Sequence, residues 1–238
     1  PQPSFGSHAR MQFRALTLLA ICTLFISVHS EEDAAADPNT ASIAGVGGLA
    51  GYEPPSNVEA HSLIDLDIRD IELLGTDYAA ATEIYENGHN SPSGDSFRTL
   101  QGFSTKYATD ENVRSEPMAL LGFRYWRDWD YSNQHVLAAL TPTDNEKYGN
   151  YMTGALASTD DARKQIIKKV IKFQMVWQYA FHELEGAYNK YHNTGLTDEE
   201  RYGLKGAIHA LDEFWAFYAG SLEDGSQEAG EVDGEGKG

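Results

Sequence analysis

The clearest pattern of apolar and polar residues runs from Asp161 to Asn193. Hydrophobic side chains recur there every three or four residues, which is the spacing of one face of an α-helix. Ser158 and Asp161 are placed to cap its start, because a hydroxyl and an acid three residues apart can bond the free amides of a first turn. The pattern predicts one long helix whose apolar stripe consists of Ile166, Val170, Phe173, Trp177, Phe181, Leu184 and Tyr188.

Shorter segments with the same period lie on both sides of this helix. Thr197 and Glu200 form a second capping pair, and the helix that follows is expected to end near Gly220. Residues 88–105 are rich in turn formers and lack a helical period, which predicts a loop. No segment alternates as a strand does. The chain is therefore predicted to be all-α, an irregular helical bundle with a long turn-rich loop and further helices over 62–74, 77–88, 116–129 and 130–142.

The two ends of the sequence differ from this helical part. Arg14 followed by the apolar run of residues 15–28, with small residues at Val28 and Ser30, is typical of a secretory signal peptide. Residues 31–57 are rich in Gly, Ala, Pro and acids, as linkers are. The expected organisation is translated upstream residues 1–10, a signal peptide 11–30, a flexible linker 31–57, a helical domain 58–220, and an acidic Gly-rich loop or truncated end 221–238.

The net charge and the cysteine content limit the kinds of partner and metal site that the protein can have. The chain has 36 acidic and 18 basic residues, a net charge of -18, which argues against nucleic acid and anionic membranes as partners and is compatible with binding cations. The one cysteine, Cys22, lies in the signal peptide. The mature protein is therefore expected to be secreted, soluble and without membrane contact, and any metal in it would need oxygen and imidazole ligands.

Candidate chemistry begins within the long helix. His182 and Glu185 lie three residues apart and so share a face, next to core residues such as Ile171. A rotation of about 100° per residue puts Glu183 on the opposite flank, in solvent. The His182–Glu185 pair is either an interior hydrogen-bonded histidine or half of a site for a hard metal ion, as helical bundles often pair Glu and His at this spacing.

Other carboxylates could complete such a site. Glu83 and Glu86 are three residues apart on a predicted helix, where a solvated face is the simpler interpretation. Asp212 lies among aromatic residues and needs a buried partner, whereas Glu213 shares a face with His209. No hydrolase triad, phosphate-binding loop or zinc-protease motif is present, so no catalytic residue is predicted.

Several motifs together resemble one family. DYAAATEIYENGHNS, RTLQGFST, EPMALLGFRYWRDWDYSNQHV, FHELEGAY and DEFWAFYAGSLEDGS occur in the same order as in algal iron-assimilation proteins, over roughly residues 60–226. The resemblance implies an extracytoplasmic, helical, cysteine-poor protein that is induced by iron limitation and assists iron uptake. Family members continue well beyond FYAGS.

The leading hypothesis is a secreted or periplasmic, non-enzymatic protein that binds Fe³⁺ or Fe²⁺ and passes it to a cell-surface iron transporter. His182, Glu185, Asp212, Glu83 and Glu86 are its candidate ligands, since carboxylates with an imidazole suit iron. The alternatives are a structural or adhesive acidic cell-surface protein and a ferroxidase-like metalloenzyme.

Overall fold

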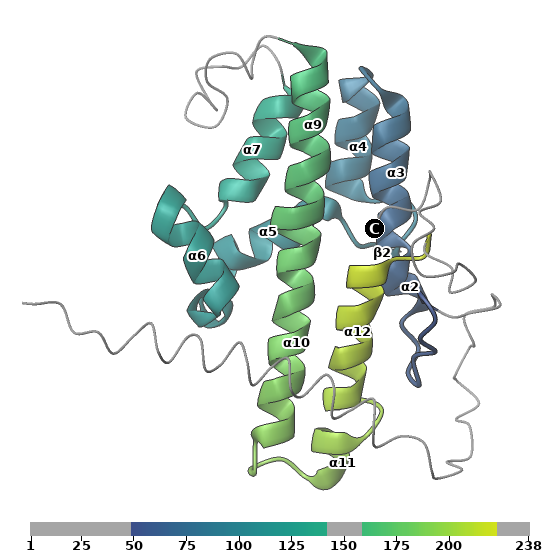
Figure 1. The fold of residues 1–238 in the computed structure, drawn as a ribbon, viewed down its shortest axis with the longest axis vertical. Coiled ribbons are helices and arrows are strands. Elements are labelled where there is room, and N and C mark those ends of the chain that lie inside the picture. Colours follow the sequence, from purple (N-terminus) through teal and green to yellow (C-terminus); the bar gives the residue numbers. More distant parts are fainter. Residues whose placement is uncertain (1–48, 142–158, 223–238) are drawn as a thin grey trace, which may run out of the picture. The chain divides into compact units, whose positions relative to one another are not determined.

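The computed structural model describes residues 49–141 and 159–222, and these residues are mainly helical (Figure 1). The all-α prediction is confirmed. Two very short strands pair in an antiparallel hairpin, with Pro92 opposite Phe97 and Ser93 opposite Ser96. Every helix in the described part is too short or too polar to span a bilayer. The elements are α2 Glu59–Ser62, α3 Ile64–Leu74, α4 Tyr78–Asn87, β1 Pro92–Ser93, β2 Ser96–Phe97, α5 Leu100–Thr109, the 3₁₀ helix η1 Glu111–Ser115, α6 Pro117–Trp126, α7 Tyr131–Leu140, α9 Asp160–Val170, the π-helix η3 Ile171–Val176, α10 Trp177–His192, α11 Asp198–Tyr202 and α12 Ala207–Ala219.

Helix ends follow the local sequence closely. Asp77 accepts a hydrogen bond from the Ala80 amide at the start of α4, and Gly75 ends α3 with a positive φ of 63°. The Thr197–Glu200 capping box is present. The long helix begins differently from the prediction: Thr159 caps α9 through the Ala162 amide, while Ser158 lies outside the described residues.

The loop predicted over 88–105 is wrong for its last third. Residues 100–105 belong to helix α5, which Thr99 caps by accepting a hydrogen bond from the Gly102 amide. Leu100, Phe103 and Tyr107 are buried at helical spacing. Gly, Ser and Thr inside the segment lower its intrinsic helix propensity, so tertiary burial determines the structure here.

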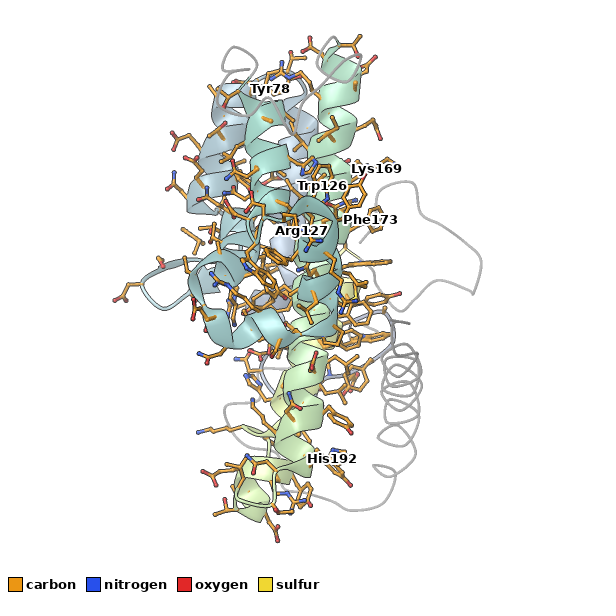
Figure 2. The ribbon with its side chains drawn as sticks, turned by 90° about the vertical axis from the view of Figure 1, so that its left-hand side faces the viewer. Tyr78, Trp126, Arg127, Lys169, Phe173 and His192 are labelled. Atoms are coloured by element: carbon orange, nitrogen blue, oxygen red, sulfur yellow. The ribbon has the colours of Figure 1, made fainter. Side chains whose placement is uncertain are left out.

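Helices α10 and α12 lie side by side and pack along most of their lengths (Figure 1). Small residues allow their backbones to approach, since Ala180 and Ala210 are fully buried. The larger side chains lie at the flanks: Trp177 stacks on Tyr218 with 5.2 Å between ring centroids, and Trp177 is only half-buried. The predicted apolar stripe is therefore only partly displaced from the core, since its Val170 and Leu184 are buried whereas its Phe173 and Phe181 are exposed. Phe173 lies at one edge of the molecule in Figure 2.

The displacement follows from the π-helix η3 in the middle of the long helix. In a continuous α-helix Glu183, twelve residues after Ile171, would lie about 120° away from it around the axis. A π-helical turn contains one extra residue. Every residue after it is therefore rotated back around the helix axis by about 100° relative to a continuous α-helix. Glu183 is thereby brought close to the line of Ile171 and Met175, which are both 0% exposed.

Both ends of the described helical part are held by hydrogen bonds to residues far away in the sequence. Leu49 is 1% exposed and its carbonyl accepts a hydrogen bond from the Trp215 indole. Asp65 accepts hydrogen bonds from the amides of Ser221 and Leu222. Residues 49–57, which end the predicted linker 31–57, pack on α12, and the first two residues of the predicted end segment 221–238 bond Asp65. The predicted upstream residues 1–10, the signal peptide 11–30 and the rest of these segments lie outside the described residues.

Candidate functional site

A pocket of about 380 Å³ opens where α2, α5, α10 and α12 meet the β1–β2 hairpin. The elements that form it come from the early, middle and late parts of the sequence, so only the folded chain brings its polar groups together. Its charged and polar lining is unusual for its variety: imidazole, guanidinium, ammonium, phenol and carboxylate all face the same space. The lining residues are His61, Ser93, Arg98, Thr99, Gly102, Phe103, Lys106, Tyr179, Glu183, Glu213 and Phe217.

The centre of the pocket is a pair of carboxyl groups, Glu183 from α10 and Glu213 from α12, referred to here as the glutamate pair. Their side chains are only 15% and 19% exposed and share a hydrogen bond. Two carboxylates this close cannot both be charged without a large cost, so one of them keeps a proton. Burial and then the charge of Glu213 raise the pKa of Glu183 to about 7.

Imidazoles surround Glu213 and explain why the shared proton lies on Glu183. Glu213 Oε1 is 3.0 Å from His61 Nε2 and 3.4 Å from His209 Nε2. Burial raises the pKa of Glu213, but the hydrogen bond from His61 and the charges of His61 and His209 outweigh it, so the net shift lowers the pKa. His209 also bonds Ser56 through Nδ1, at 2.8 Å.

His61 has competing partners in the pocket. Its Nε2 is 2.6 Å from Arg98 Nη2 and 3.0 Å from Glu213 Oε1. A neutral Nε2 can accept a hydrogen bond from the guanidinium, whereas a protonated Nε2 can donate to the carboxylate, and it cannot do both at once. The buried Nδ1 of the same ring has no hydrogen-bond partner among the described residues. The hydrogen-bonding capacity of the His61 imidazole is therefore incompletely satisfied.

A second polar chain enters the pocket from α5. Lys106 Nζ donates to the Tyr179 hydroxyl at 3.1 Å and lies 2.9 Å from His182 Nε2. Tyr179 in turn donates a hydrogen bond to Glu183, and burial followed by the charge of Glu183 raises the pKa of the phenol. The pocket thus offers two carboxyl oxygens, an imidazole nitrogen and a phenol oxygen, with Lys106 and Arg98 balancing the negative charge.

The residues predicted from the sequence have separate locations. His182 lies just outside the pocket, with Nδ1 2.6 Å from Glu116 Oε1 and Nε2 facing Lys106. Glu185 is half-buried on α10 and is absent from the pocket lining. The two candidates stay on one helix, and His182 Nε2 also lies 3.8 Å from Glu183 Oε1, beside the pocket.

The other three candidates do not reach the pocket. Asp212 is 0% exposed and is absent from the pocket lining, accepting hydrogen bonds from the Tyr52 hydroxyl and from the amide and hydroxyl of Ser56. Glu83 accepts from Asn87 on the exposed side of α4, and Glu86 is also exposed. Over residues 49–141 and 159–222, no three His, Cys, Asp or Glu side chains are already placed to hold a metal ion.

Sequence reasoning placed Glu183 in solvent, and this prediction was wrong. The π-helix rotates Glu183 toward α12, a change that uniform helical periodicity cannot anticipate. The shared face of His209 and Glu213 was the one sequence signal for this site, and their 3.4 Å contact confirms it. No sequence pattern indicated a functional role for His61, Arg98 or Lys106. The elements that carry them come together at the pocket only through tertiary packing.

Comparison with known proteins identifies the family. A family model described as low iron-inducible periplasmic protein matches residues 21–233, which is most of the chain. No curated protein and no solved structure matches it. The chain therefore belongs to the family of low iron-inducible periplasmic proteins.

Proposed function

We propose that this member of the low iron-inducible periplasmic family binds iron outside the cytoplasm and assists its assimilation without catalysing a reaction. The observation that carries the proposal is the glutamate pair, a buried carboxyl couple with imidazole and phenol groups within reach. Iron favours carboxylate, imidazole and phenolate ligands, and the sequence provides no cysteine after residue 22 to hold a softer metal.

The shared proton defines how iron would enter. In the absence of metal, the proton and the two cations Lys106 and Arg98 balance the charge of the glutamate pair. An arriving iron ion would replace the proton, draw together Glu183, Glu213 and His61, and displace the Arg98 contact from His61. Since these side chains are not already placed around a metal, binding requires them to shift, and such a site can release its cargo as well as take it up.

The primary test is an equilibrium titration of the purified mature protein with Fe³⁺ and, under anaerobic conditions, with Fe²⁺. We expect saturable binding of one iron ion per chain. Absence of stoichiometric binding would favour the structural or adhesive alternative. Repeated consumption of oxygen with added Fe²⁺ would instead indicate a ferroxidase, which catalyses turnover where a carrier does not.

The affinity for iron should depend on pH. Below about pH 7 Glu183 carries the proton, which the metal must displace, so affinity falls as the pH drops and rises as Glu183 ionises. Release of one proton per iron bound predicts a change of about tenfold per pH unit below the pKa. Titrations between pH 5.5 and pH 8 measure this slope. An affinity independent of pH across that range would contradict the role of Glu183.

A further inference from the structure

Helix α6 presents an apolar face that nothing in the described structure covers. Met118, Leu121 and Tyr125 are 38%, 50% and 79% exposed, and their i, i+3, i+7 spacing aligns them along one side of the helix. Arg124 is exposed on the same side. These four residues are the outer face of α6. A single exposed leucine is ordinary, but three large apolar side chains in one row are typical of a contact surface.

The opposite side of α6 is fixed against the protein, so the helix cannot turn to bury its outer face. Ala119 is 2% exposed, and Phe123 stacks on Trp129 with 4.0 Å between ring centroids. Gly122 lies so close to Tyr131 that a Cβ there would come within 2.3 Å of its ring. Glu116, at the N-cap, bonds His182. The exposure of Leu121 and Tyr125 is therefore a consequence of tight packing behind them.

The charge of this face is opposite to that of the chain. Arg124 and Arg127 are exposed, and within the described residues no carboxylate pairs with either of them, although the chain carries a net charge of -18. Arg127 ends α6 in the left-handed region, with φ 59°. Its position at the end of α6 is labelled in Figure 2. Complementarity thus favours a partner whose contact surface is apolar at its centre and acidic at its rim.

We propose that the outer face of α6 docks into an apolar, acid-rimmed groove of a protein on the cell surface. Anchors at i, i+3 and i+7 on a short helix are those that a hydrophobic groove recognises. A second copy of the chain fits poorly, because a symmetric contact through this face would bring Arg124 and Arg127 close to the same arginines of the other copy. An anionic membrane fits poorly too, because it repels an acidic chain that offers two arginines.

This docking face has a direct structural connection to the glutamate pair. Glu116 at the start of α6 lies 2.6 Å from His182 Nδ1, and Lys106 links His182 to Tyr179 in the pocket. A partner bound to α6 would therefore lie next to the Glu116–His182–Lys106 contacts that reach Glu183. The inference that the partner receives the iron rests on the proposed function.

Photo-crosslinking on intact cells tests the proposal. Benzoylphenylalanine at position 121 is compared with the same residue at position 73, where Leu73 is 77% exposed on α3. The labelled proteins are applied to iron-starved cells of the source organism. We expect a protein adduct from position 121 and none from position 73, abolished by excess parent protein but not by excess Leu121→Asp/Tyr125→Asp variant. The same variant should bind the cells at least about tenfold more weakly, since loss of an anchor commonly costs that much.

The other outcomes overturn the proposal. An adduct with the mass of two chains identifies a second copy as the occupant, and a lipid adduct identifies the membrane. Equal adducts from both positions, or none from position 121, show that the face is not a docking site. Iron titration of the Leu121→Asp/Tyr125→Asp variant in solution separates this proposal from the proposed function, because the variant should bind iron like the parent if only docking is lost.

Discussion

Replacing both members of the glutamate pair, Glu183→Gln with Glu213→Gln, is expected to abolish strong iron binding while leaving the fold intact. Glutamine keeps the shape and the hydrogen-bonding capacity of the side chain but cannot provide a negative oxygen ligand. The loss should exceed the roughly 10–100-fold that removal of a supporting residue costs at a metal site. Competition titration with a chelator of known affinity measures the change, and circular dichroism checks the helical content.

The matched control is Glu83→Gln with Glu86→Gln, which removes the same number of carboxyl groups from the exposed side of α4. We expect less than about a twofold change from this control, since exposed charges this far from the pocket are screened by salt. A folded pocket variant that binds iron as well as the parent would locate iron binding elsewhere. In that case the His182→Ala/Glu185→Ala variant is the next to be titrated.

The fold was largely predictable from local sequence, because its helices carry strong caps and stops. Asp77, Gly75 and Thr197 each act within three residues of their own position, so their effects can be deduced without tertiary information. Helix α5 was missed for the opposite reason. Its Gly, Ser and Thr weaken the local signal, and only the burial of Leu100 and Phe103 in the folded protein makes it helical.

The pocket was far less predictable than the fold. The angular argument that singled out His182 and Glu185 assumed an uninterrupted α-helix, and the π-helix at 171–176 invalidates it for Glu183. His61 and Arg98 belong to a four-residue helix and to the end of a hairpin, respectively, where periodicity has no predictive value. Their 2.6 Å contact exists only because α2 packs against the β1–β2 hairpin in the folded chain.

Asp212 was a reasonable candidate ligand by sequence, and its burial was correctly expected. The structure supplies a different reason for that burial, because Asp212 anchors residues 49–56 to α12 by three hydrogen bonds. Burial raises the pKa of Asp212, although the hydrogen bonds from Ser56 and Tyr52 oppose the shift. Whether the residue also binds metal can be decided by measuring stability and iron affinity in the same variant.

The Asp212→Ala variant is expected to be strongly destabilised. It leaves the half-buried Tyr52 hydroxyl and the buried amide of Ser56 without their acceptor, whereas the Ser56 hydroxyl keeps His209 as a partner, and each buried unsatisfied group costs about 1–3 kcal/mol. The free energy of unfolding, measured with urea, should fall by about 3 kcal/mol or more. A double-mutant cycle with Ser56→Ala should show strong coupling, since Ser56 accounts for two of the three bonds. In the absence of urea, where the variant is folded, its iron affinity should match that of the parent. A large loss of iron affinity with little loss of stability would instead indicate that Asp212 is a metal ligand.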